Sequence, residues 1–266
     1  MYSFVYFSCR RDFYTLSKSI DSIKLVYPDS KIFIFEDPEN GFSQEQILEL
    51  KEKISYIQPH PLGFSPKNGN GKDTFKAQVE AYNFALSKSN SELIIKIDSD
   101  TLISKKLNEY IDKSFDLIGT EVVYLNESKY IYGNLYIMSY RFVQLLSQIT
   151  NQDFDKLNND AKSYYAENRV IFGLAHILNT KTKIYPHDKG FVFNVDFISN
   201  YRISKASKTN IINSFSLTKM NQYPSIHYWS SNELVKYHLE KKYLLFYYFL
   251  FKKILGVLLD ILFVSV

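Results

Sequence analysis

Cysteine is almost absent from this chain. Its 266 residues include a single cysteine, Cys9, so no intrachain disulfide can form. No N-terminal stretch joins basic residues to a long apolar segment and a small-residue cleavage site, which is the pattern of a secretory signal. These two absences argue against a disulfide-stabilised secreted domain, and we expect a protein of the reducing cytoplasm.

A strong charge imbalance and an uninterrupted apolar span are also missing. The formal net charge is only +4. We therefore expect no nucleic-acid partner, although the charge is compatible with acidic substrates or anionic lipid. Near the C-terminus, Lys252 and Lys253 divide an apolar stretch, whereas a membrane-spanning helix needs about 20 uninterrupted apolar residues. The sequence therefore predicts no spanning helix there.

Hydrophobic residues are plentiful, at 45% of the chain, which is enough for the core of one large domain or two closely packed halves. Apolar runs typical of strands alternate with helical patterns. The predicted strands are 2–8, 31–35, 54–58 and 93–97, and the predicted helices are 12–26, 43–53 and 73–87. Such repeated units predict an α/β fold with a mostly parallel, Rossmann-type sheet flanked by helices, and ligands at the carboxyl ends of the strands.

Two of the predicted helices begin at recognisable caps. Asp12 stands where it can cap the first helix, and Ser43 with Gln46 three residues later forms the pattern of a capping box. Residues 59–72 are rich in proline and glycine and predict a loop.

A pair of carboxylates closes the fourth predicted strand. The apolar run stops on Asp98 and Asp100, so a rigid sheet edge would hold two oxygen ligands at one point. Mg²⁺ or Mn²⁺ prefers such oxygens and leaves positions open for phosphate, which suits a nucleotide diphosphate. The same spacing recurs at Asp153 and Asp155, but among polar neighbours and with no strand before it. We interpret this second pair as a solvated loop or a helix start.

The order of elements and motif in residues 1–103 resembles the nucleotide-binding half of a GT-A-fold glycosyltransferase, whose aspartate-x-aspartate motif follows the fourth strand. The resemblance implies nucleotide contacts from the first two strand ends and the aspartate motif, namely Ser8, Arg10, Arg11, Asp37 and Asp98. From the residues alone, the two arginines fit a solvated helix start equally well, and Asp37 fits a turn.

Two segments of the second half are similar to further parts of this family. Residues 130–139 read as a strand interrupted by Gly133 and followed by a helix at 140–148. The resemblance places such a segment in the acceptor pocket, while a bulged core strand is the alternative. Residues 165–175 resemble the family's acidic helix start.

The resemblance gives Glu167 the role of a base that deprotonates the acceptor hydroxyl, or of an electrostatic stabiliser. Asn168 stands where many inverting members have aspartate, and an amide cannot act as a base. Either Glu167 takes the role alone, or Asn168 marks a retaining enzyme. The alternative is that Glu167 is only a charge favoured at a helix N-terminus.

His227 completes the predicted metal site. GT-A enzymes often bring a histidine from near the C-terminus to the metal, so the resemblance implies a set of Asp98, Asp100 and His227 around Mn²⁺ or Mg²⁺. The C-terminal tail is a separate feature. Lys241 and Lys252 are eleven residues apart and so share a helix face, which predicts an amphipathic helix lying in the plane of an anionic membrane. Packing in the core or against a partner subunit is the alternative, which leaves oligomerisation open.

We accordingly divide the chain into a nucleotide-sugar-binding half at 1–103, an acceptor-binding and catalytic half of the same domain at 104–232, and a membrane-associating tail at 233–266. The resemblance implies a metal-dependent hexosyltransferase, and the amphipathic tail predicts that it lies on the inner face of the plasma membrane. Its donor is a nucleotide diphosphate sugar, for which a UDP-sugar is expected. Its acceptor is a hydroxyl of a lipid-linked saccharide or of a bacterial surface glycan, such as capsule or lipopolysaccharide.

Two alternatives to this function stay open. A nucleotidyltransferase of sugar phosphates shares this type of sheet, but it usually opens with a glycine-rich, basic first loop that residues 2–12 lack. A non-catalytic, membrane-attached glycan-binding or assembly protein would not need the carboxylate pair. Metal-dependent nucleotide binding separates it from the enzyme.

Overall fold

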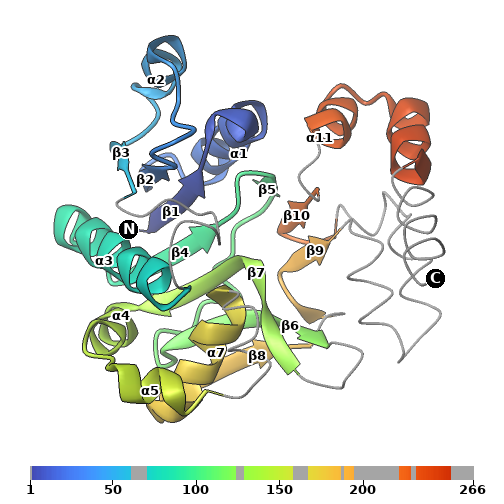
Figure 1. Ribbon diagram of the computed structural model, residues 1–266. Coiled ribbons are helices and arrows are strands. Elements are labelled where there is room, and N and C mark those ends of the chain that lie inside the picture. The colour runs from blue at the N-terminus through green and yellow to red at the C-terminus, as the bar shows by residue number, and fades with distance from the viewer. Residues whose placement is uncertain are drawn as a thin grey trace, which may run out of the picture.

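Seven strands form the central sheet of the computed structural model, in the order β3-β2-β1-β4-β7-β6-β8 (Figure 1). The structure describes residues 2–60, 71–123, 129–157, 167–186, 189–194, 222–228 and 232–252. The strands of this sheet are β1 (Ser3–Ser8), β2 (Lys31–Glu36), β3 (Tyr56–Pro59), β4 (Leu93–Ile97), β6 (Leu117–Val123), β7 (Lys129–Ser139) and β8 (Thr182–Tyr185). Only β7 runs antiparallel to its neighbours, which confirms the prediction of a mostly parallel sheet.

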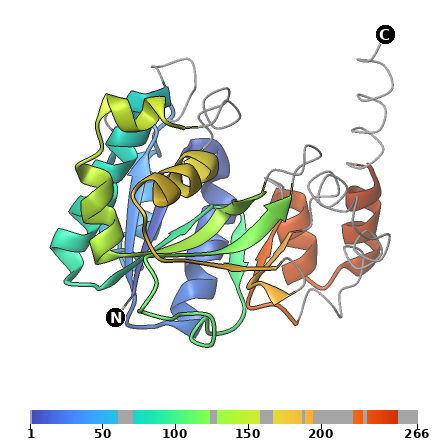
Figure 2. The same ribbon diagram turned by 90° about the horizontal axis from the view of Figure 1, so that it is seen from below.

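Helices cover both faces of this sheet (Figures 1 and 2). They are α1 (Phe13–Val26), α2 (Gln44–Leu50), α3 (Gly71–Ser89), α4 (Tyr140–Ser147), α5 (Asn151–Asp155) and α7 (Glu167–Ile177). Apolar side chains of α1 pack with one face of the sheet, and those of α3, α4, α5 and α7 pack with the other. Adjacent residues of β4 show the alternation, because Ile94 belongs to the α3 side and Ile95 to the α1 side.

The two predicted caps have different outcomes. Ser43 forms the predicted capping box with Gln46 at the start of α2. Asp12 was predicted as the cap of the first helix, and this is wrong, because its side chain makes no capping hydrogen bond. A short 3-10 turn, η1 (Arg10–Asp12), precedes α1 and leaves Asp12 at φ −93°, ψ 7°, outside the extended conformation that a capping residue needs. Its carboxylate instead accepts hydrogen bonds from the Cys9 thiol and from Arg11.

The second aspartate pair lies at a helix start, as expected. Asp153 is in the first turn of α5 and completes a capping box with Thr150. Its carboxylate also accepts a hydrogen bond from Lys156, so these contacts account for it without a metal.

The predicted glycine-interrupted strand is confirmed as β7, and it carries an irregularity opposite β6. Tyr136 pairs with Gly119, yet Ile131 already pairs with Glu121, so four residues of β7 between these pairs face a single residue of β6. Gly133 lies within this bulge. Bulges re-aim a strand's side chains, and this one lies beside the end of β4.

A smaller sheet joins the end of β4 to the C-terminal part of the chain. It consists of β5 (Thr101–Ile103), β10 (Ser225–His227) and β9 (Val192–Asn194), with β10 in the middle. Two helices, α11 (Asn232–Leu239) and residues 243–252, pack on it through an apolar cluster that includes Leu102, Ile226, Phe246 and Leu250. Both views place these helices at the end of the molecule away from α3 and α4 (Figures 1 and 2).

The C-terminal helix therefore has a face in the chain's own core, which is one of the alternatives for the tail. The prediction that Lys241 and Lys252 share one helix face is wrong, because Lys241 lies at φ 56° in the turn between α11 and helix 243–252. Within the described part of the chain, no helix is long and apolar enough to cross a membrane. The predicted tail continues to residue 266, and its part from 253 onward lies outside the described residues. The same holds for residues 61–70 of the predicted loop.

Candidate functional site

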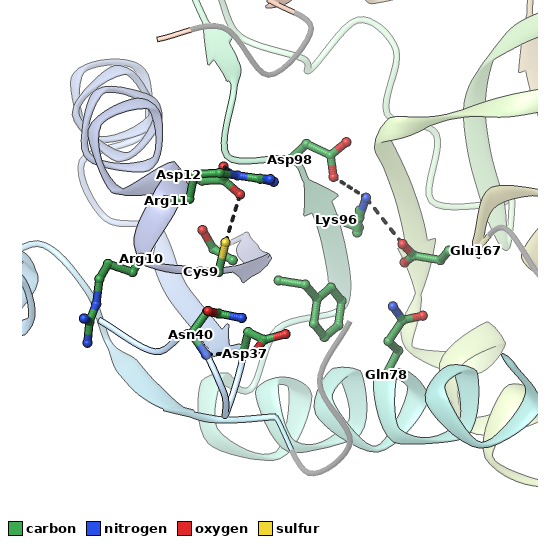
Figure 3. Close-up of a pocket in the computed structure, with 12 residues that line it drawn as sticks. Cys9, Arg10, Arg11, Asp12, Asp37, Asn40, Gln78, Lys96, Asp98 and Glu167 are labelled. Atoms are coloured by element: carbon green, nitrogen blue, oxygen red, sulfur yellow. Dashed lines mark hydrogen bonds and ion pairs between the residues drawn. The ribbon is translucent and has the colours of Figure 1, made fainter. Parts of the chain in front are cut away.

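The carboxyl ends of the parallel strands meet at a pocket of ≈ 850 Å³ (Figure 3). Ser8 ends β1, Asp37 follows β2 and Asp98 follows β4, and all three line this pocket. The full lining is Phe7, Ser8, Cys9, Arg10, Arg11, Asp12, Asp37, Asn40, Gln78, Lys96, Asp98 and Glu167. The structure therefore brings the predicted nucleotide contacts and Glu167 to one cavity.

Asp98, Asp100 and His227 come together beside this pocket. One ligand atom from each lies within 4.8 Å of the others, and His227 Nε2 is 3.1 Å from Asp100 Oδ1. The backbone explains the convergence of residues so distant in sequence. Asp100 directly precedes β5, and β10 pairs antiparallel with β5 so that His227 lies opposite Thr101.

This triad fits a divalent cation in its chemistry. It offers carboxylate oxygens and one imidazole nitrogen, a mixed set that suits Mn²⁺ and, through the oxygens, Mg²⁺. The Asp98 backbone is fixed because its N–H donates to Asn134 O at 2.8 Å, and Tyr228 N–H donates to Asp100 O at 3.1 Å. Each carboxylate thus stands on a backbone held by a neighbouring strand.

The first loop contributes its side chains unequally. Arg11 is largely exposed and extends toward the side of the pocket where Asp98 lies, whereas Arg10 donates from Nε to Gly41 O at 2.9 Å and points away (Figure 3). Asp37 is buried, and its Oδ1 accepts hydrogen bonds from the backbone of Glu39 and Asn40. Asp37 therefore shapes its own turn, as the alternative interpretation held, while it also lines the pocket.

Glu167 stands at the opposite wall, in the first turn of α7 (Figure 3). Its Oε1 accepts hydrogen bonds from the phenols of Tyr82 and Tyr136, and its Oε2 lies 3.4 Å from Lys96 Nζ. These three contacts hold both oxygens of the carboxylate, Oε1 by the two phenols and Oε2 by the lysine.

Lys96 joins Glu167 to the aspartate motif. Its ammonium donates to Asp98 Oδ1 at 2.5 Å, so one lysine bridges two acidic side chains on the pocket floor (Figure 3). Burial disfavours the charged form of Lys96, but the charges of Asp98 and Glu167 outweigh burial and raise its pKa above the ordinary value. The lysine is therefore a fixed positive charge.

Asp98 has an unusual environment for a carboxylate. Burial among protein atoms raises the pKa of Asp98 above its ordinary value, although 40% of its side-chain surface is exposed. The positive charge of Lys96 lowers this pKa, and the negative charge of Asp100 raises it further. A carboxylate surrounded in this way gains from a nearby cation.

Asn168 is not among the residues that line the pocket. Its amide nitrogen donates to Ile131 O at 2.7 Å, and its side chain lies against Gly133. Asn168 thus holds the bulge of β7 against the start of α7.

Lys96, Tyr82 and Tyr136 are site residues that the sequence reasoning missed. The signal for Lys96 is a charge in the middle of an apolar strand, two residues before the aspartate pair. Gln78 and Asn40 also line the pocket and were not predicted. The sequence carries no comparable signal for the tyrosines, because they look like ordinary core positions among 22 tyrosines.

The sheet order and the aspartate pair at its edge define a fold of the GT-A type. No family model matches the chain, and no curated protein matches it either. Solved structures of glycosyltransferases do share the fold. An active-site mutant of the galactosyltransferase LgtC superimposes with a TM-score of 0.50 at 10% identity, over 86% of this chain and 87% of that chain.

Two further structures are similar over nearly the same part of this chain. The glycosyltransferase GlyE of Streptococcus pneumoniae TIGR4 gives a TM-score of 0.52 at 13% identity, over 85% of this chain and 54% of that one. The bifunctional glycosyltransferase WbbM gives 0.50 at 11% identity, over 87% and 46%. The chain thus spans about half the length of GlyE and WbbM. The predicted GT-A-like fold is confirmed.

Proposed function

We propose that this chain is a metal-dependent glycosyltransferase. It moves a sugar from a nucleotide diphosphate donor, for which a UDP-sugar is the first candidate, to a hydroxyl of a surface glycan or lipid-linked saccharide. The observation that carries the proposal is the triad of Asp98, Asp100 and His227 beside the strand-end pocket of a GT-A-like sheet. Against a nucleotidyltransferase stands the first loop, since residues 2–12 lack its glycine-rich pattern, and a glycan-binding protein would not need the carboxylate pair.

The protein's own residues divide the work as follows. Asp98, Asp100 and His227 hold the divalent cation, which when bound offsets the charge of the leaving diphosphate. Ser8, Arg11 and Asp37 line the part of the pocket that takes the nucleotide. Glu167 lies across the pocket from them and faces the sugar.

We assign Glu167 the role of an electrostatic stabiliser rather than a base. The phenols of Tyr82 and Tyr136 already donate hydrogen bonds to its Oε1, and its Oε2 forms an ion pair with the protonated ammonium of Lys96. A general base needs an oxygen within reach of the acceptor hydroxyl, whereas a stabiliser needs only a fixed negative charge near the anomeric carbon. The contacts of Glu167 suit the second role. Asn168 contributes indirectly, because its side chain holds the backbone of β7 at Ile131.

We also propose that the protein attaches to the inner face of the plasma membrane through helix 243–252. Phe246 and Leu250 turn inward, but Leu244, Tyr248 and Phe251 are 89%, 60% and 64% exposed and follow the i, i+4, i+7 spacing of one helix face. Exposed lysines flank this face, including Lys242. An apolar stripe beside cations suits an anionic membrane surface, where lipid-linked acceptors reside.

The test of the enzymatic proposal is a screen of nucleotide sugars for Mn²⁺- or Mg²⁺-dependent hydrolysis and transfer. The Asp100→Asn variant keeps the shape of the side chain and removes its charge, so it should lose at least about tenfold in Mn²⁺-dependent affinity for a nucleoside diphosphate by calorimetry. Asp153→Asn is the matched control from the second aspartate pair and should bind as the wild type does. Unchanged affinity in Asp100→Asn would contradict the proposed metal site.

A further inference from the structure

Lys96 is a charged residue in the buried, otherwise apolar strand β4. It is the fourth residue of β4, whose other members are leucine and isoleucine, and only 5% of its side-chain surface is exposed. Burying a lysine charge is strongly unfavourable unless partners surround it. The position therefore needs an explanation beyond packing.

Three protein groups surround the ammonium of Lys96. An ammonium group has three hydrogens, and Lys96 Nζ has three acceptors around it, namely Asp98 Oδ1, the Gly133 carbonyl and Glu167 Oε2. Two of these contacts are hydrogen bonds, to Asp98 and Gly133, and the third is an ion pair with Glu167 at 3.4 Å. We therefore look for the role of Lys96 in its effect on Asp98, Gly133 and Glu167.

The contact with Asp98 has a consequence for metal binding. Because Oδ1 of Asp98 accepts from Lys96 at 2.5 Å, one of its lone pairs is no longer open to a cation, and Oδ2 is the oxygen without this contact. The ammonium also places a positive charge next to a site built for another cation. Both effects weaken the hold of the triad on metal.

The contact with Glu167 acts on the other side of the pocket. The Tyr82 and Tyr136 phenols hold Oε1, and Lys96 holds Oε2, so the three donors fix the plane of the carboxylate. The Gly133 carbonyl ties the same lysine to the bulge of β7.

We propose that Lys96 is a positioning residue that couples the two halves of the site. Its ammonium takes one lone pair of Asp98 Oδ1 away from the metal, and it keeps Glu167 oriented toward the sugar. The inference rests on the proposed function, since it assigns Lys96 a role in the same metal-dependent transfer. In this role Lys96 lowers the affinity of the triad for metal and at the same time holds Glu167 in place.

The test is the Lys96→Met variant, which keeps the length of the side chain and removes the charge. We expect Mn²⁺ alone to bind about tenfold more tightly by calorimetry, because a like charge disappears and Asp98 Oδ1 regains a free lone pair. We expect turnover with the active nucleotide sugar to fall at least about tenfold, because Glu167 loses a partner. Lys96→Arg restores the charge and should return Mn²⁺ affinity toward that of the wild type.

Two further variants separate the two roles. Tyr136→Phe removes a donor to Glu167 without touching Asp98, so turnover should fall while Mn²⁺ affinity stays unchanged. Lys51→Met removes an exposed lysine and should change neither quantity. If Lys96→Met does not fold, as judged by circular dichroism and melting, Lys96→Gln is measured with the same expectations.

The outcomes distinguish this inference from the proposed function. Tighter Mn²⁺ binding with lower turnover supports the inference, since a purely structural lysine would weaken binding and turnover together. Two results overturn the inference while the wild type still binds metal and transfers sugar. The first is unchanged or weaker Mn²⁺ affinity in Lys96→Met, or in Lys96→Gln where that variant replaces it. The second is normal turnover in the same variant or in Tyr136→Phe. A wild type that binds neither Mn²⁺ nor UDP overturns the proposed function, and the inference falls with it.

Discussion

Glu167 is the residue whose surroundings most restrict its chemistry. Three donors from three elements converge on its carboxylate, namely Tyr82 of α3, Tyr136 of β7 and Lys96 of β4. An enzyme that needed only a helix-start charge would not require this arrangement. The geometry instead fits a fixed negative charge that acts on the substrate.

The Glu167→Gln variant tests this assignment. It keeps the size of the side chain and removes the charge, so turnover should fall by about two orders of magnitude or more with little change in donor affinity. Steady-state kinetics with a nucleotide sugar and separate calorimetry with the nucleoside diphosphate measure the two quantities. Glu52→Gln, at an exposed position, is the control. Near-normal turnover in Glu167→Gln would reduce Glu167 to a helix-start residue.

At this scale the sequence predicts residues that stand at visible boundaries and misses those that depend on distant partners. Asp98 and Asp100 are recognisable because they end an apolar run. Lys96 carries a local signal, a charge within an apolar strand, but its role depends also on Gly133, 37 residues away, and on Glu167, 71 residues away. His227 could be placed only through the family resemblance, since the pairing of β10 with β5 is a long-range contact.

The elements of the fold show the same division between local and long-range causes. The Ser43–Gln46 capping box needs only residues three apart, and the structure has it. The Asp12 cap failed because the preceding 3-10 turn sets the backbone of Asp12, and the pattern of the helix does not reveal that turn. Likewise, the glycine of β7 signals an irregularity, but its partner in β6 is not legible from the sequence.

The capping box of α2 gives a prediction at the scale of the element. Ser43→Ala removes the acceptor for the Gln46 backbone N–H and should lower the free energy of unfolding by about 1 kcal/mol. Urea denaturation followed by circular dichroism measures the change. Gln44→Ala is a matched control one residue away at an exposed position, and it should stay within about 0.5 kcal/mol of the wild type. Equal stability of the two variants would show that the cap contributes nothing.

At the scale of the whole molecule, the two sheets join parts of the chain that are far apart in sequence. β4 of the first half pairs with β7 of the second, and β10 near the C-terminus pairs with β5 right after the aspartate motif. The metal triad is therefore complete only when the large sheet and the small sheet have both formed. The C-terminal helices pack on the small sheet, so they support the triad from behind.

This packing changes how membrane attachment has to be tested. Deleting the last helix would remove Phe246 and Leu250 from the cluster that holds β10, and a loss of vesicle binding could then result from unfolding. Substitutions on the exposed stripe avoid the problem, because Leu244 and Phe251 contribute little to the core. Two glutamates there introduce charge where we propose lipid contact.

The full-length wild type should co-sediment with anionic vesicles, and more weakly at high salt, since each lysine near the surface contributes on the order of 1 kcal/mol. The Leu244→Glu/Phe251→Glu double variant should lose at least about tenfold in vesicle affinity, because it removes two apolar contacts and adds repulsion. Leu25→Glu/Leu48→Glu is the matched control on α1 and α2, where both leucines are exposed, and should bind as the wild type does. If the wild type ignores vesicles but forms a dimer that the first double variant dissociates, the stripe is an oligomer contact and the membrane proposal is wrong.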